Sequence, residues 1–166
     1  RAQIIAKMNA LVEPGVIAAL YAASAAGVRI ELIVRGVCAL RPGVKGLSEN
    51  IRVISVVGRF LEHSRIWYFH DDGAQSLYLS SADWMDRNLF RRVEIGFPVL
   101  DSKLKARVLK EGLRPYLTDD SQAWLMTADG SYHRRSSRNK LGKSAQQLLL
   151  TTLGTSTTSA PATGKP

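Results

Sequence analysis

Apolar residues recur at helical spacing at the start of the chain. They are Ile4, Ile5, Met8, Leu11 and Val12. This spacing predicts a helix over residues 2–26. Because proline fits the first turn of a helix, we expect Pro14 to restart the helix as a second, alanine-rich piece. Gly27 follows as a natural C-cap, so the helical region is expected to end there.

Five later stretches are rich in branched and aromatic residues and predict strands. They read "VRIELIVRG" (residues 28–36), "IRVISVVG" (51–58), "IWYFHDDG" (66–73), "QSLYLSS" (75–81) and "RRVEIGFPVL" (91–100). The third and fourth are expected to pair as a hairpin with a turn around Asp71, Asp72 and Gly73. Between the first two, "CALRPGVKGLSEN" contains a proline and two glycines and is predicted to be a loop.

A second helix is predicted over residues 101–117, "DSKLKARVLKEGLRPYL". Asp101 is a suitable N-cap, and apolar side chains follow at Leu104, Val108 and Leu109. Strands interleaved with helices favour an α/β layered domain, in which helices flank a mixed sheet.

The composition changes near residue 136. The chain has 17 basic and 14 acidic residues up to Asp129, a balance of +3, but six basic and no acidic residues from Gly130 on. "LGTSTTSAPATGKP" has no large apolar residue after Leu153 and is predicted to be disordered. We therefore divide the chain into a folded domain, 1–135, and a flexible tail, 136–166. The tail is basic at first and then rich in Ser, Thr, Gly and Pro.

Bulk properties limit the class of protein. With 166 residues and 45% hydrophobic content, the chain is long enough for one domain with a real core. Cys38 is the single cysteine, so no internal disulfide forms, and a reducing, cytoplasmic compartment is expected. The apolar runs are far shorter than the roughly 20 residues of a membrane span. The opening "RAQIIAKMNALV" already lies inside an amphipathic pattern, so we expect a piece of a longer polypeptide.

The pair His63 and Arg65 is the first candidate for chemistry. A strand is expected to begin here, and alternation along it would point both side chains to one face. Histidine can shuttle a proton or carry a phosphoryl group near neutral pH, and arginine can hold phosphate oxygens. A structural histidine beside a surface arginine is the alternative that spacing leaves open. His70 and His133 do not form metal-ligand spacing with His63, and no Walker loop occurs.

Two further stretches place polar residues just after strands. Arg35 ends the first predicted strand, where ligands gather in α/β sheets, and Arg41 lies in the loop that follows. Ser81 and Asp83 follow the hairpin, with Arg87 one short turn later. These residues could hold an anion, or they could cap carboxylates and face solvent.

The order of these motifs carries more information than any one of them. H-x-R, then S-S-A-D, then a glutamate resembles the H-x-K, G-S-x-N, E pattern of the phospholipase D fold. The segments "LIVRGVCALRPGVKGLSENI", "SVVGRFLEHSRI" and "YLSSADWMDRNLFRRVEIGFPVLD" resemble the last catalytic domain of the phospholipase D-like polyphosphate kinase family. The resemblance covers residues 2–133. It implies a phospholipase D-like fold and reversible transfer of the ATP γ-phosphate to inorganic polyphosphate through a phosphohistidine, with Mg²⁺.

The resemblance implies a role for several residues. His63 matches the family's second active-site histidine, which acts as acid/base or stabilises the transition state. Arg35 and Arg87 match phosphate-contacting arginines. The remaining matches that could bind phosphate are Arg65, Ser81 and Asp83. The phosphorylated histidine, the adenine site and the metal ligands belong to preceding domains, so this chain should supply the second half of the site and be inactive alone.

The resemblance also implies partners. They are ATP or ADP, polyphosphate, the preceding domains and, in the whole protein, further copies of itself; no specific nucleic acid is expected. The basic run at the start of the tail leaves open a peripheral association with the inner membrane face. Two rival functions remain: a phospholipase D-type phosphodiesterase or nuclease half-site, and a non-catalytic polyanion-binding module.

Overall fold

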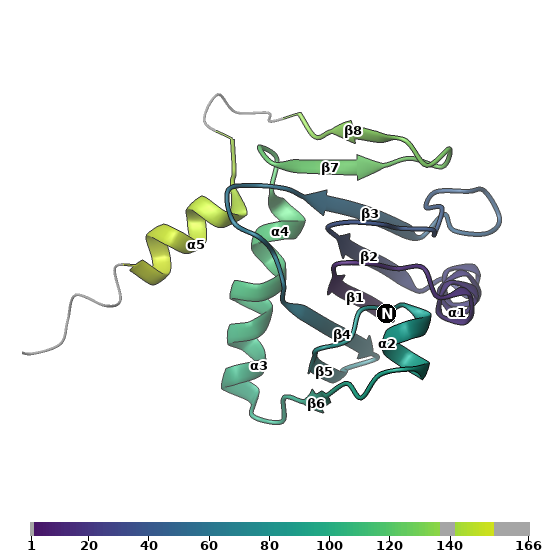
Figure 1. Cartoon of the computed structure of the whole chain (residues 1–166), viewed down its shortest axis with the longest axis horizontal. Coiled ribbons are helices and arrows are strands. Elements are labelled where there is room, and N and C mark those ends of the chain that lie inside the picture. Colours follow the sequence, from purple (N-terminus) through teal and green to yellow (C-terminus); the bar gives the residue numbers. More distant parts are fainter. Residues whose placement is uncertain (1, 137–141, 155–166) are drawn as a thin grey trace, which may run out of the picture.

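The computed structural model describes residues 2–136 and 142–154 and is built around one sheet (Figure 1). The eight strands have the order β6-β5-β4-β1-β2-β3-β7-β8. They are β1 (Gln3–Met8), β2 (Arg29–Val34), β3 (Ile51–Val56), β4 (Arg65–Asp71), β5 (Ala74–Ser80), β6 (Gly96–Pro98), β7 (Ala123–Met126) and β8 (Tyr132–Arg134). β1, β2 and β3 run parallel, and the other neighbouring pairs run antiparallel. The predicted mixed sheet is confirmed.

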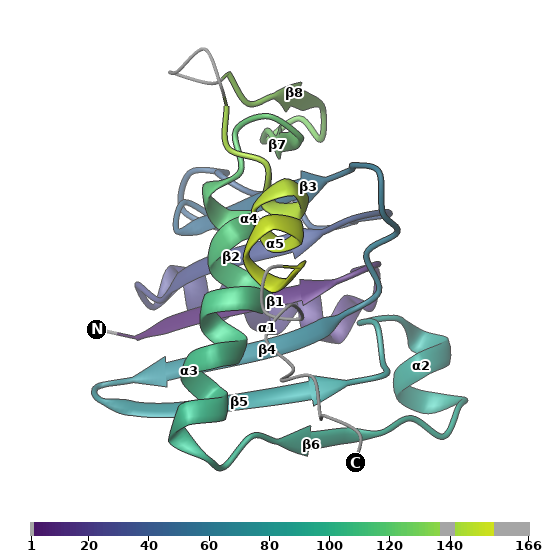
Figure 2. The ribbon, with the colours of Figure 1, turned by 90° about the vertical axis from the view of Figure 1, so that its left-hand side faces the viewer.

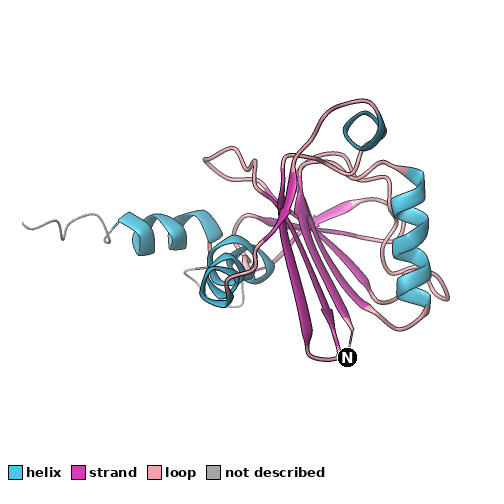
Figure 3. Ribbon diagram, turned by 90° about the horizontal axis from the view of Figure 1, so that it is seen from below, coloured by secondary structure: helices cyan, strands magenta, loops and turns pink. Residues whose placement is uncertain are grey.

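Helices cover both faces of this sheet (Figure 3). One face carries α1 (Pro14–Ala25), and the other carries α3 (Ser102–Val108), α4 (Arg114–Thr118) and α5 (Ala145–Gly154), which lie in front of the sheet in Figure 2. The short helix α2 (Asp86–Phe90) follows β5. The buried apolar residues form two clusters, one beneath each layer of helices. The chain therefore has the flanked α/β architecture that the pattern predicted.

The segment before Pro14 corrects one prediction, because residues 3–8 form strand β1 and the helix exists only as α1. β1 lies at the centre of the sheet, between β2 and β4. Both of its faces are covered, so its apolar residues form a run instead of alternating, and such a run fits a buried strand as well as a helix. Pairing with strands far along the chain decides between the two.

The predicted hairpin of β4 and β5 is confirmed. The strands pair from Arg65 with Ser80 to Asp71 with Ala74. Asp72 and Gly73 form the turn with φ of 41° and 101°, the left-handed conformation that a two-residue hairpin loop requires. By contrast, the strand predicted over residues 91–100 contains only the three residues of β6, at the edge of the sheet.

The predicted helix after Asp101 is also confirmed. The Asp101 carboxylate accepts the Leu104 N–H at 2.8 Å as its N-cap. The helix runs through a π-helical turn, Leu109–Leu113, into α4. In this turn a side chain at Gly112 would place its Cβ 2.4 Å from Ile66 Cδ1, so glycine allows the helix to lie close against β4.

The tail differs from its prediction. Residues 145–154 were expected to be flexible, but they form α5, with Ala145 and Gln146 buried. Ala145 joins the core cluster beneath α4, and Leu149 packs against it. The other parts of the predicted tail, 137–141 and 155–166, lie outside the described residues. Within the described ranges, no helix is long and apolar enough to cross a membrane.

Candidate active site at the carboxyl edge of the parallel strands

The topology brings the candidate residues other than Arg41 to one edge of the sheet. The parallel strands β1, β2 and β3 end there at Met8, Val34 and Val56. β4 runs antiparallel to β1 and so begins at this edge, and β5 returns to it, because Arg65 pairs with Ser80. The residues that follow β2 and β5, and those that precede β4, therefore meet at the edge where ligands bind in open α/β sheets.

Arg35 leaves β2 at this edge and is half-buried. Its Nε donates to Asn9 Oδ1 at 3.1 Å, and the backbone of Gly36 donates to Asn9 O at 2.8 Å. Its carbonyl accepts the hydroxyl of Ser55 at 3.0 Å. The two terminal nitrogens of the guanidinium have no protein partner in the part of the chain that the structure describes. The residue is thus fixed at its base and free to donate at its tip.

Arg65 and Asp83 form a two-pronged ion pair. Arg65 Nε and Nη2 lie 3.1 and 3.0 Å from the two carboxylate oxygens of Asp83. Arg65 Nη1 donates to the carbonyl of His63 at 2.9 Å, and the N–H of Asn9 donates to Asp83 at 2.7 Å. We expected both side chains to contact phosphate, but the Arg65 guanidinium and the Asp83 carboxylate are hydrogen-bonded within the protein. A continuous chain of hydrogen bonds therefore links Arg35, through Asn9, Asp83 and Arg65, to the backbone of His63.

His63 lies in the loop of residues 57–64 between β3 and β4. Its side chain is exposed and has no hydrogen bond or ion pair among the residues described. Because β4 begins only at Arg65, His63 precedes the strand, and the predicted sharing of one strand face does not apply. Arg65 Nη1 contacts the His63 carbonyl, so Arg65 holds the backbone of His63 and not its imidazole.

Ser81 holds a turn together. Its hydroxyl donates in a short hydrogen bond to Glu94 and accepts the N–H of Ile95 at 3.0 Å. Asn88 donates to the second oxygen of Glu94 at 2.5 Å. The hydrogen bonds from Ser81 and Asn88 lower the pKa of the Glu94 carboxyl and keep it ionised. Ser81 is thereby engaged with protein groups.

The other two arginines differ in surroundings. Arg87, in α2, is exposed, and its guanidinium has no partner within residues 2–136 and 142–154. Arg41 lies away from this edge. Its Nη1 donates to Ala128 O at 3.2 Å, and its backbone N–H donates to the Tyr21 hydroxyl at 2.8 Å. The contacts of Arg41 hold its loop, whereas Arg87 is available to an anion.

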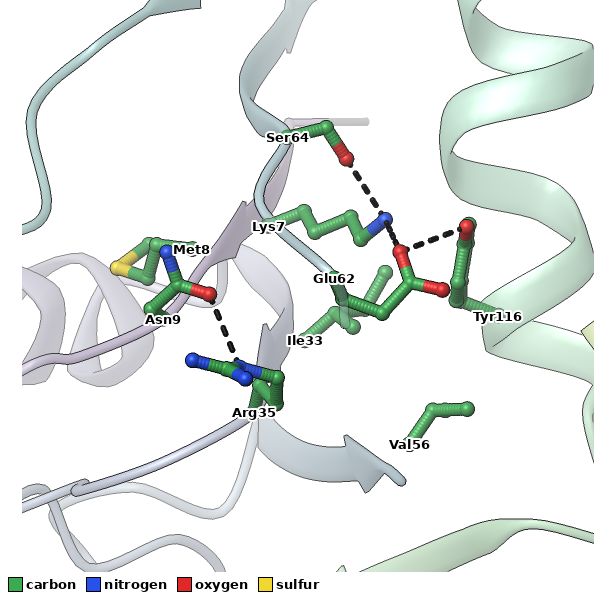
Figure 4. Close-up of a pocket in the computed structure, with 9 residues that line it drawn as sticks. All are labelled: Lys7, Met8, Asn9, Ile33, Arg35, Val56, Glu62, Ser64 and Tyr116. Carbon is green, nitrogen blue, oxygen red and sulfur yellow. Dashed lines mark hydrogen bonds and ion pairs between the residues drawn. The ribbon is translucent and has the colours of Figure 1, made fainter. Parts of the chain in front are cut away.

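Sequence reasoning missed a buried polar cluster beneath the His63 loop (Figure 4). The Lys7 ammonium lies 2.8 Å from Glu62 Oε2 and 2.8 Å from Ser64 Oγ, and 3.5 Å from the centre of the Tyr116 ring. The Tyr116 hydroxyl donates to the same Glu62 oxygen at 2.9 Å. A cavity of about 10 Å³, with room for about one water molecule, lies between this cluster and Arg35. The signal in the sequence is a lone lysine inside an apolar run.

Burial and hydrogen bonding shift the pKa values in this cluster. Burial lowers the pKa of the Lys7 ammonium against the opposing pull of Glu62. Burial acts to raise the pKa of Glu62, but the hydrogen bonds from Lys7, Gln146 and Tyr116 and the positive charge of Lys7 together outweigh it, so that pKa is lowered. Burial and the Glu62 charge raise the pKa of Tyr116. Glu62 is therefore ionised and Tyr116 protonated at neutral pH.

The donor set does not suit a resident magnesium ion. No group of three His, Cys, Asp or Glu side chains that could hold a metal occurs in the ranges that the structure describes. The carboxylates at this edge are already engaged, Asp83 with Arg65 and Glu94 with Ser81 and Asn88. The edge is rich instead in cationic donors, which suits an anion such as a phosphate chain.

Comparisons with known proteins identify the family. Residues 1–147 match the family model described as polyphosphate kinase C-terminal domain 2. The chain is 66% identical over 150 residues to a polyphosphate kinase of Burkholderia ambifaria, and 60% identical over 154 residues to one of Paraburkholderia phytofirmans. These matches cover 90% and 93% of the chain but 22% of each relative, so the chain spans about a fifth of their length.

A solved structure gives the same answer for the fold. The crystal structure of polyphosphate kinase from Porphyromonas gingivalis superposes with a TM-score of 0.88 at 40% sequence identity, covering 94% of this chain and 24% of that one. The match to the family model covers most of the sequence, including the whole of the edge just described. The chain belongs to the polyphosphate kinase family, as its C-terminal domain 2.

Proposed function

We propose that this chain forms the second half of the active site of an ATP:polyphosphate phosphotransferase. In the whole protein, the γ-phosphate of ATP would move reversibly to inorganic polyphosphate through a phosphohistidine carried by another part of the polypeptide. The observation that carries the proposal is the state of His63: its imidazole is exposed and unpartnered among the described residues, while its backbone is tied to the Arg35 network.

The roles follow from what phosphoryl transfer requires. Charge spreads over the equatorial oxygens of the moving group, and catalysis consists mainly of positioning and electrostatic stabilisation. The free guanidinium nitrogens of Arg35 and the guanidinium of Arg87 supply donors for those oxygens. His63 supplies a group that can give or take a proton near neutral pH, at the leaving oxygen or at the phosphoimidazole.

Three residues that the sequence led us to expect at the phosphate are proposed to act indirectly, by positioning other residues. Arg65 and Asp83 join the His63 backbone to the rest of the edge, and Ser81 fixes the turn through Glu94. Their contacts support positioning of the loops. We assign direct contact with phosphate to His63, Arg35 and Arg87 alone.

The substrates and partners belong to the whole protein. ATP or ADP and polyphosphate are the proposed substrates, and the preceding domains the proposed carriers of the phosphohistidine. Mg²⁺ is proposed as a cofactor held by those domains, since the described donor set here does not suit it. A cytoplasmic homo-oligomer, with peripheral membrane association through the basic run, remains part of the proposal.

The test uses a whole polyphosphate kinase that carries this chain. We expect His63→Ala to lower ATP-dependent polyphosphate formation by about 100-fold or more, while His133→Ala, a change at another exposed histidine, leaves the rate within about twofold. The isolated chain should form no polymer. Full activity of His63→Ala would overturn the proposal in favour of a polyanion-binding module, and hydrolysis of a phosphodiester by the isolated chain would favour the phospholipase D-type reading.

A further inference from the structure

The loop that carries His63 is poorly held by its own packing. Residues 57–64 contain no helix or strand, and the large apolar side chains Val57, Phe60 and Leu61 are exposed by 56%, 44% and 68%. A catalytic group on such a loop needs external support, because misplacement by about 1 Å can cost two orders of magnitude in rate. The support comes from two sides.

The first support is Gln146, from α5. Its Oε1 accepts the N–H of Phe60 at 2.9 Å, and its Nε2 donates to the carbonyl of Phe60 at 2.8 Å. The same Nε2 donates to Glu62 Oε1 at 2.8 Å. The side-chain amide thus pairs with both backbone groups of Phe60, as a neighbouring strand would. Gly58 permits this approach, since a Cβ there would lie 2.5 Å from Gln146 Oε1.

The second support is Lys7, from β1. Its ammonium contacts Glu62 and Ser64, the two residues on either side of His63. Lys7 is 3% exposed and sits on a central strand, so it cannot follow a moving loop. Lys7 therefore donates a hydrogen bond to one carboxylate oxygen of Glu62, and Gln146 donates one to the other.

The helix that carries Gln146 is itself anchored. Asp119, which is wholly buried, accepts the N–H of Ala145 at 2.7 Å at the start of α5. The N–H of Asp120 donates to Lys143 O at 3.0 Å just before the helix. Leu149 packs on the core cluster one turn later. Gln146 therefore fixes the His63 loop relative to the core.

From these contacts we infer that Gln146 is a positioning residue for His63, acting through Phe60 and Glu62. The inference rests on the proposed function, since it matters for catalysis only if His63 does. It assigns a role to a helix that composition alone marks as a tail. Gln146 acts without touching substrate: it restricts the loop to the arrangement in which the imidazole faces the phosphate chain.

A double-mutant cycle tests the inference in a whole polyphosphate kinase that carries this chain. We expect Gln146→Ala to lower kcat for polyphosphate formation about 10- to 100-fold, with KM for ATP changed less than about threefold. In a His63→Ala background the same substitution should change the residual single-turnover rate less than about threefold, because the residue acts through His63. Gln147→Ala, at the next and exposed position of α5, should stay within about twofold of the parent.

The outcomes separate the possible failures. An equal fold-loss from Gln146→Ala in both backgrounds would show a merely structural role and overturn the inference. A His63→Ala variant with undiminished activity would overturn the proposed function, and the inference with it. If Gln146→Ala does not fold, Gln146→Met keeps the length of the side chain without its hydrogen bonds and is carried through the same cycle.

Discussion

Lys7 and Glu62 form a buried ion pair across 55 residues of sequence, with Nζ 2.8 Å from Oε2. The side chains are 3% and 12% exposed, so water screens the pair little. The pair joins the central strand β1 to the residue before His63. The pair is therefore expected to contribute to the stability of the fold and, through the position of His63, to the proposed catalysis.

Removing the ammonium should destabilise the fold. Lys7→Met leaves the Glu62 carboxylate buried without its counter-charge, so we expect the free energy of unfolding to fall by about 3–5 kcal/mol. Urea unfolding measures this change. Lys7→Met with Glu62→Gln removes both charges and should recover most of the loss. A single variant as stable as the parent would show that the pair is open to water in solution.

The pH dependence of stability should report on Glu62. Its pKa in the folded chain is lowered from the ordinary value of 4.5, because hydrogen bonds from Lys7, Gln146 and Tyr116 and the charge of Lys7 together outweigh burial. As the pH falls, the unfolded chain takes up the proton first. The stabilisation by Glu62 is therefore complete above about pH 4.5 and is lost as the pH falls through the folded pKa.

The measurement compares the parent with Glu62→Gln between about pH 3 and pH 7. The variant lacks the carboxyl group, so its free energy of unfolding should fall less steeply in the acid range. Other carboxylates, such as Glu94, titrate in both proteins and cancel in the difference. Parallel curves would contradict the assignment of the lowered pKa to Glu62.

Local pattern was sufficient for much of the fold. The branched run of β2, the turn residues Asp72 and Gly73 and the N-cap Asp101 each act through neighbours in sequence, and each was predicted. β1 was not, because a short apolar run does not separate a buried strand from a helix. Its strand character comes from β2 and β4, which lie later in the chain.

The site shows the same division. Position and spacing singled out His63, Arg35 and Arg87, and the family motifs gave them roles that stay proposals. The partners of the His63 loop were missed, since Gln146 lies 86 residues from Phe60 and sits in a stretch whose composition indicates a tail. Arg65 and Asp83 were grouped with phosphate ligands, yet the structure pairs them with each other. Spacing identifies residue types that suit a chemistry, and it does not say which of them are already engaged.

The anchor of α5 gives a further prediction. Asp119 is wholly buried and accepts the N–H groups of Ser121, Gln122 and Ala145 at 2.7–3.0 Å. Asp119→Asn replaces one acceptor oxygen by a donor that faces an N–H group, so we expect a loss of about 1–3 kcal/mol in unfolding free energy. Thermal and urea unfolding check this value.

Asp101→Asn provides the matched control. Asp101 caps α3 at the surface through one N–H, and asparagine caps a helix about as well as aspartate. That variant should remain within about 0.5 kcal/mol of the parent. Equal effects of the two substitutions would argue against a special role of the buried carboxylate.

Because the π-helical turn packs closely against β4, we expect a glycine-to-alanine substitution in it to destabilise the fold, against the usual preference of helices. Alanine normally favours a helix over glycine, but a Cβ at Gly112 would lie 2.4 Å from Ile66 Cδ1. We expect Gly112→Ala to destabilise the chain by about 1–3 kcal/mol through overpacking. Gly154→Ala, where a Cβ meets no atom of the described residues within 4 Å, is the control and should be neutral or slightly stabilising. Stabilisation by Gly112→Ala would mean that the Ile66 side chain or the helix can move aside.

Two arginines near α2 allow a proposed phosphate contact to be compared with an ordinary surface charge. Arg87 is exposed with no partner in the described part of the chain, whereas Arg91 Nε lies 2.7 Å from the exposed carboxylate of Asp86. Since exposed side chains of this kind add little to stability, the unfolding free energies of Arg87→Ala and Arg91→Ala should each lie within about 0.5 kcal/mol of the parent value.

In a whole polyphosphate kinase that carries this chain, Arg87→Ala should lower the rate of polyphosphate formation about tenfold or more, because a donor to the moving charge is lost. Arg91→Ala should leave the rate within about twofold. Equal rates for the two variants would remove Arg87 from the proposed site and leave Arg35 and His63 as its residues in this chain.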